Sequence, residues 1–349
     1  MNINSWKFLF GSGVLGLILS SIIIMIVLYF VKSSKKKLRK LSLRDQHIEQ
    51  ISRFGGIGLC WGFLISFAIL WFLIIEETKI GIEFLPKNRI AGLCVGAMLA
   101  WLIGLVDDLV NLRARWKLFF QIILSFFAIG MGFNIESIQL PILQIVDLGS
   151  WSWLITSLWI IGIINAINLI DGLDGLASSL SIVALICLGI ICWWEGQNSL
   201  IIIICTLIGG TIGFLSFNRP QASIFMGDSG SMFLGFSLAT LSIWVTDLPG
   251  RGPSVIPVLI FAVPILDTGF ALFRRFFKGI PFYSADKDHL HHRLIYRGFT
   301  STQAMLILIV FSILFGVLAL MAHRIMNFWG FAFLLGISLA YILLYWLGY

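Results

Sequence analysis

Four clusters of polar and charged residues interrupt an otherwise apolar chain, and their side chains suit phosphate and metal chemistry. In chain order they contain Asp107, Asp108 and Lys117; Asn165, Asn168, Asp171 and Asp174; Asn218 and Asp228; and His289, His291, His292 and Arg293. Carboxylate and amide oxygens suit Mg²⁺, which takes one or two protein ligands and completes its shell with phosphate oxygens. Lysine, arginine and histidine supply positive charge and donors for a diphosphate. This combination predicts metal-assisted phosphoryl transfer.

The adjacent carboxylates Asp107 and Asp108 have two interpretations. They could hold a metal, or shift each other's pKa so that one serves as a base or nucleophile. Taken alone, the pair could equally cap a helix at a membrane surface. Glycines flank the acids of the second and third clusters, at Gly172, Gly175 and Gly227, and would let the backbone approach a ligand closely.

The other acids and the histidines also have structural interpretations. Asp228 could be only the N-cap of a helix. The run 165–174 could be only a polar turn, although its four polar groups and two Asp-Gly pairs favour a functional site. The three histidines lack the spacing of a zinc site. Asp267 lies inside an apolar segment, where an acid is either functional or held by a partner such as Arg274.

The composition is that of a membrane protein. Of the 349 residues, 59% are hydrophobic and 12% are charged, whereas soluble proteins have about 25% charged residues. Apolar runs of about twenty residues recur along the chain, each long enough to cross a bilayer. They predict one all-α polytopic membrane domain over 1–349, with no room for a soluble domain between the runs.

Eleven transmembrane helices are expected from these runs. Their predicted ranges are 8–31, 57–75, 90–106, 117–134, 152–169, 176–194, 199–217, 231–246, 254–273, 303–322 and 326–348. The stretch 135–150 is too short to span and predicts a small hairpin or an interfacial segment. The first run is too long for a signal peptide and has basic residues after it, so we expect it to remain as an anchor.

Basic residues orient these helices. If the loop after the first span is cytoplasmic, that side contains 18 lysines and arginines and the other side 6. The positive-inside rule then predicts an outside N-terminus, a cytoplasmic C-terminus and all four clusters on the cytoplasmic face. Orientation in an anionic bilayer accounts for the net charge of +7, so no nucleic acid is expected as a partner. The five cysteines lie in apolar segments and are expected to pack as small hydrophobic residues.

The clusters, in this order, resemble the polyprenyl-phosphate N-acetylhexosamine-1-phosphate transferase family. The resemblance runs from Arg53-Phe-Gly-Gly-Ile-Gly to Arg293. Its most specific strings are Asn165-Ala-Ile-Asn-Leu-Ile-Asp-Gly-Leu-Asp-Gly-Leu-Ala and Phe225-Met-Gly-Asp-Ser-Gly-Ser. The segment His289-Leu-His-His-Arg-Leu resembles the bacterial branch that primes O-antigen, enterobacterial common antigen and wall teichoic acid synthesis. The peptidoglycan branch, phospho-MurNAc-pentapeptide transferase, has a different histidine segment.

The resemblance implies an activity and a set of roles. Such enzymes transfer a sugar 1-phosphate, by default GlcNAc-1-phosphate, from a UDP-sugar to undecaprenyl phosphate in the bacterial plasma membrane and release UMP. It implies Mg²⁺, with Mn²⁺ as a substitute, on Asn168 and Asp228, and it places Asp107 and Asp108 near the lipid phosphate. Around the donor it implies Lys117, Asp171, Asp174, Asn218 and the His289–Arg293 segment. A homodimer is expected only by analogy.

The sequence departs from the family pattern at one position, and two alternative functions were considered. Bacterial relatives often carry Asp-Asp-x-x-Asp, whereas this chain has Asn111 last. Eukaryotic dolichyl-phosphate relatives carry Asn there too, so activity is expected, but a catalytic role for this position is in doubt. The alternative functions are a phospho-MurNAc-pentapeptide transferase, which the histidine segment disfavours, and a secondary transporter, which would place polar groups at the midplane. Which aspartate is the base, and whether transfer takes one step or two, stays open.

Overall fold

The computed structural model describes residues 3–39, 51–76, 85–139, 145–247, 256–279, 289–325 and 329–347, and most of them are helical. The helices are α1 (Ile3–Arg39), α2 (Gly55–Glu76), α3 (Lys87–Val110), α4 (Ala114–Gly130), α5 (Ser152–Ile170), α6 (Leu176–Trp194), α7 (Asn198–Asn218), α8 (Gly227–Thr246), α9 (Ile256–Ile260), α10 (Ala262–Phe277), α11 (Leu290–Tyr296), α12 (Ser301–Arg324) and α13 (Trp329–Leu347). Two short strands, β1 (Ser137–Gln139) and β2 (Ile145–Asp147), and a 3-10 turn, η2 (Gly149–Trp151), lie between α4 and α5.

Eight of the described helices are long and apolar enough to cross a membrane, namely α1, α2, α3, α5, α6, α7, α8 and α12. The chain is therefore a multi-pass helical membrane protein, as its composition predicts. The other three expected spans fall on shorter or broken helices. The span 117–134 corresponds to α4, 254–273 to α9 with α10, and 326–348 to α13. Residues 254–255, 326–328 and 348 of these spans, and the basic segments 40–50 and 280–288, lie outside the described residues.

A proline accounts for the break between α9 and α10. Phe261 separates the two helices, with φ −97° and ψ 18°. Pro264 has no N–H to donate to the carbonyl of Ile260, so a regular α-helix cannot continue through this point. Helical bonding resumes where the Ile265 N–H donates to the Phe261 carbonyl at 3.0 Å. The second piece, α10, carries the buried acid Asp267.

The segment 135–150, which was too short to span, contains a hairpin. β1 and β2 pair antiparallel, with Ser137 opposite Asp147 and Ile138 opposite Val146. Residues 140–144 between them lie outside the described residues. The side chain of Ser152, at the start of α5, donates to the Ile135 carbonyl at 2.7 Å. This bond ties the hairpin to the helix that follows it.

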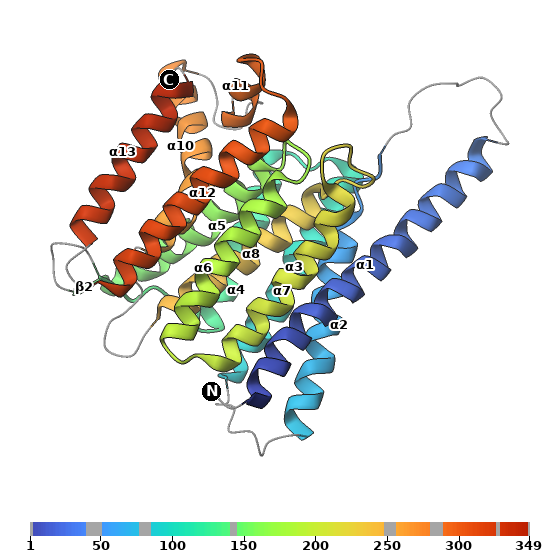
Figure 1. Ribbon diagram of the computed structural model, residues 1–349, viewed down its shortest axis with the longest axis horizontal. Coiled ribbons are helices and arrows are strands. Elements are labelled where there is room, and N and C mark those ends of the chain that lie inside the picture. Colours follow the sequence, from blue (N-terminus) through green and yellow to red (C-terminus); the bar gives the residue numbers. More distant parts are fainter. Residues whose placement is uncertain are drawn as a thin grey trace.

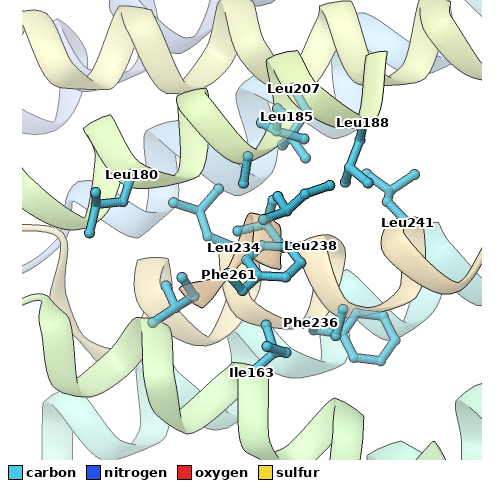
Figure 2. Packing of buried hydrophobic residues seen from close by; sticks show 14 of the residues in the cluster. Ile163, Leu180, Leu185, Leu188, Leu207, Leu234, Phe236, Leu238, Leu241 and Phe261 are labelled. Carbon is cyan, nitrogen blue, oxygen red and sulfur yellow. The ribbon is translucent and has the colours of Figure 1, made fainter. Parts of the chain in front are cut away.

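Helix α8 forms the centre of the bundle (Figure 1), and every residue from Ser229 to Thr246 is buried. In Figure 2 its side chains Leu234 and Leu238 lie between Leu185 on one side and Ile163 on the other. Because lipid is as apolar as these side chains, such a helix is held by close packing rather than by exclusion from water. Glycines let neighbouring helices approach each other closely. A Cβ at Gly104 of α3 would lie 2.3 Å from the Asp228 carbonyl oxygen.

One end of the bundle collects the polar clusters. Helices α3, α5 and α7 finish there and α4, α6 and α8 begin there. We call this the site end, and the end where α8 finishes the far end. Figure 1 shows α11 and the last turn of α13 at the site end, whereas α1 starts at the far end.

Candidate active site

The Lys117 ammonium group connects three of the polar clusters. Its Nζ lies 2.8 Å from Asp107 Oδ2 and 3.1 Å from Asp228 Oδ1. It also donates to Asn168 Oδ1 at 3.2 Å. The four side chains come from the site-end turns of α4, α3, α8 and α5. Clusters that are up to about 120 residues apart in the chain therefore meet around one cation.

The two asparagines of the second cluster have different surroundings. Asn168 Nδ2 donates to Asp228 Oδ1 and, at 2.7 Å, to Ser231 Oγ, so Asn168 belongs to the charged group. Asn165, one turn earlier, exchanges hydrogen bonds with the buried Gln121 of α4 at 2.8 and 3.3 Å. Asn165 therefore joins α4 to α5, which keeps Lys117 beside Asn168.

Asp108 caps helix α8 from a neighbouring helix. Helix α8 has no side-chain cap of its own at Met226. Instead, Asp108 Oδ1 accepts the Asp228 N–H at 2.8 Å and Asp108 Oδ2 accepts the Ser229 N–H at 2.9 Å. Gly227 has φ +71°, and a Cβ there would lie 2.7 Å from Asp108 Oδ2. Both oxygens of Asp108 thus satisfy orphan helix N–H groups and fix the turn that carries Asp228.

Asp107 is buried and has different partners from Asp108. Its Oδ1 accepts the Leu112 N–H at 2.7 Å, while its Oδ2 meets Lys117. Asn111, the position of the departure from the bacterial pattern, ends α3 in the left-handed region with φ 51°. Asparagine tolerates this conformation well. The left-handed backbone conformation therefore explains an asparagine at position 111 without a catalytic role.

A cavity of about 320 Å³ opens beside these residues. It is lined by Arg53, Asp108, Asn168, Asp171, Gly172, Leu173, Asp174, Asn218, Phe225, Met226, Gly227 and Asp228. Asn218 is buried in its wall, where it accepts the Gly175 N–H at 3.0 Å and donates to the Ile224 carbonyl at 2.9 Å. Asp174 accepts the Ala222 N–H at 3.2 Å. These bonds join the loop after α5 to the loop before α8.

Arg53 lines the cavity but was not among the site residues expected from the sequence. It is positioned because Phe225 N–H donates to the Ser52 carbonyl at 2.8 Å and Gly55 N–H donates to the Phe225 carbonyl at 3.0 Å. The segment before α2 is thus paired with the segment before α8. The only signal in the sequence was that Arg53 opens the Arg-Phe-Gly-Gly-Ile-Gly string of the resemblance.

The histidine segment approaches the cavity through His291, which packs against the lining residue Gly172. A Cβ at Gly172 would lie 2.7 Å from His291 Nε2, so the imidazole rests against the cavity wall. His291 is buried, and neither ring nitrogen has a hydrogen-bond partner among the described residues. His292 and Arg293 follow on α11, half-buried. Like His291 itself, they are not among the cavity-lining residues in the part of the chain that the structure describes.

Two groups outside the spans have clearly displaced pKa values. Desolvation raises the pKa of Asp171, and the carboxylates of Asp228, Asp108 and Asp174 raise it further. Burial lowers the pKa of His291 to about 4, and the neighbouring His292 contributes to this decrease. The neighbouring carboxylates therefore disfavour a further negative charge on Asp171, whereas burial keeps His291 neutral at physiological pH.

The residues at the site end fit a hard divalent cation. Five carboxylates gather there, against the cations Lys117 and Arg53; they belong to Asp107, Asp108, Asp171, Asp174 and Asp228. Oxygens of Asn168 and Asp228 already converge on one positive charge, the Lys117 ammonium. Mg²⁺ needs only one or two such ligands beside phosphate and water. Among the described residues no three His, Cys, Asp or Glu side chains gather as ligands, so an all-protein zinc site is not formed there.

Comparison with known proteins identifies relatives over most of the chain. Residues 90–246 match the model of glycosyl transferase family 4. The chain is 32% identical to a probable undecaprenyl-phosphate N-acetylglucosaminyl 1-phosphate transferase of Bacillus subtilis, over 88% of this chain and 84% of that protein. It is 28% identical to the undecaprenyl-phosphate alpha-N-acetylglucosaminyl 1-phosphate transferase of Escherichia coli K12, over 85% and 81% of the two chains.

The family match covers α3 through α8, which are the helices that supply Asp107, Lys117, Asn168 and Asp228. The relatives align well beyond these helices on both sides. This chain belongs to glycosyl transferase family 4, the polyprenyl-phosphate sugar-1-phosphate transferases.

Proposed function

We propose that this protein transfers GlcNAc-1-phosphate from UDP-GlcNAc to undecaprenyl phosphate and releases UMP. The observation that carries the proposal is the convergence of Asp107, Asn168 and Asp228 on Lys117 beside a cavity at one end of a membrane bundle. The names of the relatives support the substrates, because each relative is an undecaprenyl-phosphate N-acetylglucosaminyl 1-phosphate transferase. In the reaction a lipid phosphate oxygen bonds to the β-phosphorus of the donor, and the bond to the bridging oxygen of UMP breaks.

On the donor side, Asn168 and Asp228 would hold Mg²⁺, or Mn²⁺ in its place. The ion, when bound, would neutralise the diphosphate and the charge that develops on UMP. Lys117 contacts both residues and would add a second positive charge. Arg53 and the loop 171–174 line the cavity where the nucleotide and sugar would lie. His291 packs behind this wall against Gly172, with both ring nitrogens buried and without a partner among the described residues.

On the acceptor side, the contacts favour different roles for the two adjacent aspartates. Asp108 spends both oxygens on the first turn of α8, so we assign it the positioning of Asp228. Asp107, paired with Lys117, would orient the lipid phosphate or accept its proton. A two-step route needs a carboxylate free to attack phosphorus. Because every oxygen of Asp107 and Asp108 has a partner, we favour direct displacement.

The membrane location serves this chemistry. The acceptor's polyprenyl tail would stay in lipid while its phosphate meets a water-soluble donor at the site end. The charge count of 18 to 6 supports a cytoplasmic site end. The similarity to bacterial relatives supports the plasma membrane of a bacterium as the location. Of the rival functions, a transporter would need its polar groups near the midplane, whereas these groups lie at the ends of α3, α5 and α8.

The test is UMP release by the purified protein in detergent, with undecaprenyl phosphate, Mg²⁺ and a panel of UDP-sugars. We expect lipid-dependent release with UDP-GlcNAc that EDTA abolishes. Release only with UDP-MurNAc-pentapeptide would place the protein in the peptidoglycan branch. If protein that is monodisperse and thermally stable releases no UMP from any donor, the transferase proposal is wrong.

A further inference from the structure

Asp267 is an acid inside the bundle that the proposed chemistry does not use. It lies on α10 just after the Pro264 break and is 1% exposed. Its Oδ2 is 3.0 Å from His289 Nδ1, and its Oδ1 accepts the Leu290 N–H at 2.7 Å. The sequence suggested Arg274 as the partner of Asp267, but the hydrogen bonds described for its carboxylate go to the histidine segment.

The contact with Asp267 fixes the chemical form of His289. An ionised carboxylate only accepts hydrogen bonds, so His289 Nδ1 must carry the proton that they share. In a neutral ring of this form the other nitrogen, Nε2, is the acceptor. His289 is itself buried, so water does not readily exchange the two tautomers. A carboxylate that orients a histidine in this way is a recurring device of binding and catalytic sites.

Two contacts connect His289 to the cavity wall. The rings of His289 and His291 are parallel, with centroids 5.8 Å apart and planes at 2°. His291 in turn rests on Gly172, which lines the cavity. Asp267 also holds the Leu290 N–H at the start of α11. One carboxylate therefore sets both the start of α11 and the ring that stacks on His291.

We propose that Asp267 is a positioning residue that holds His289 in its Nδ1–H tautomer and thereby aligns the histidine segment with the substrate cavity. The proposal rests on the proposed function for its effect on catalysis, but the tautomer itself can be measured without any substrate. Asp267 touches neither the cavity nor the polar cluster around Lys117. Its hydrogen bonds go to His289 and to the Leu290 N–H. Because an asparagine at this position can keep the second bond, the effect through His289 is testable by a coupled pair of variants.

The first experiment compares Asp267→Asn with the wild type. The Asn amide oxygen can still accept the Leu290 N–H, while its amide group donates to His289 Nδ1 and forces the Nε2–H tautomer. We expect UMP release to fall about 10- to 100-fold with little change in thermal unfolding. Asp247→Asn is the matched control, because Asp247 is an ion-paired acid at the far end of α8. Its activity should stay within about twofold of wild type.

The second experiment reads the tautomer directly. The chain has 5 histidines, so ring ¹⁵N correlation spectra of ¹⁵N-histidine-labelled protein are tractable, and a His289→Gln variant identifies the His289 signals. We expect the Nδ1–H form in the wild type and in Asp247→Asn, and the Nε2–H form in Asp267→Asn. An Nε2–H form in the wild type, or the same tautomer in all three proteins, would overturn the proposal.

A double-mutant cycle separates positioning from a general loss of folding. If Asp267 acts through His289, then adding Asp267→Asn to His289→Gln should cause less than about a twofold further loss of activity. A full additional loss of 10-fold or more would show that Asp267 acts elsewhere and would contradict the proposal. If the wild type releases no UMP from any donor, the proposed function fails, while the ¹⁵N spectra still decide whether Asp267 sets the tautomer.

Discussion

The two ends of helix α8 carry one acid each, and the two acids are held very differently. At the far end, Asp247 follows the helix and pairs one to one with Arg89, with Oδ2 and Nη2 2.5 Å apart. At the site end, Asp228 shares Lys117 with Asp107 and Asn168. The charge of Asp247 is neutralised by a single arginine, whereas Asp228 belongs to a group with more carboxylates than cations.

Cavity size does not distinguish these two ends. The far-end cavity next to Asp247 is about 610 Å³, larger than the cavity of about 320 Å³ at the site end. What differs is the chemistry of the walls. The site-end walls gather acids from separate helices, glycines that admit close approach, and the first turn of a buried helix. Convergent charge in excess of its counter-ions, rather than volume, identifies the functional end.

The largest expected difference between the two ends follows from removing one acid at a time. Asp228→Asn should lower UMP release by about 10³-fold or more, because the proposed metal and diphosphate site loses its carboxylate. Asp247→Asn should leave release within about twofold of wild type. Equal losses in the two variants, measured on protein of matched purity, would show that α8 does not divide into a functional and a structural end.

Removal of the Lys117 ammonium group, which Asp107 and Asp228 share, should have the second-largest effect. Lys117→Gln should reduce UMP release by about 100-fold, because Asp107 and Asp228 then repel each other and the diphosphate loses a donor. The variant should also lose about 3 kcal/mol of unfolding free energy, since the buried Asp107 has lost its partner. Adding Asp107→Asn should recover much of this stability but none of the activity. Recovery of activity by the double variant would mean that Lys117 is only a counter-ion.

Crowding the start of α8 should have a smaller effect. Gly104→Ala introduces a Cβ 2.3 Å from the Asp228 carbonyl oxygen, so the first turn of α8 must move. We expect about a 10-fold loss of UMP release and about 1–3 kcal/mol of destabilisation from overpacking. Gly162→Ala on α5 meets nothing within 4 Å and serves as the control. A full-activity Gly104→Ala enzyme would show that the position of Asp228 is not critical.

The last expected effect concerns stability alone and is a pH dependence at the site end. The pKa of His291 is lowered to about 4 from the ordinary value of 6.5. Between these values the unfolded chain binds a proton that the folded protein does not. Above about pH 6.5, His291 therefore has no effect on the free energy of unfolding. As the pH drops to about 4, protonation of the unfolded chain lowers that free energy by up to about 3 kcal/mol.

Thermal unfolding of the wild type and of His291→Leu across this pH range measures that contribution. The His291→Leu variant should lack the part of the slope between about pH 6.5 and 4. Parallel curves for the two proteins would contradict a buried neutral His291.

The sequence predicted the membrane class and the meeting of the clusters because both depend on local composition. Long apolar runs define most of the spans, and charges that end helices on one side of a membrane must share a face. The glycines beside Asp171 and Asp228 were expected to let the backbone approach a ligand, which stays a prediction. In the structure Gly172 and Gly227 lie close to the side chains of His291 and Asp108.

Contacts between distant segments were beyond a single sequence. Nothing in the adjacent pair Asp107 and Asp108 indicates that one faces Lys117 and the other caps α8. Arg53 enters the cavity only through pairing of residues near Ser52 with Phe225. The helix break was predictable in principle from Pro264, but hydropathy averages over it, so 254–273 was expected as one span.

The central claim, that the site end and not the far end holds the divalent cation with the donor, is tested most directly by Mn²⁺ binding. Electron paramagnetic resonance would count Mn²⁺ bound per protein in the presence of UDP-GlcNAc and without acceptor lipid. We predict that the wild type and Asp247→Asn bind about one Mn²⁺ per chain and that Asp228→Asn loses this binding. If Asp228→Asn binds Mn²⁺ as tightly as the wild type, the assignment of the metal and donor to the site end is wrong.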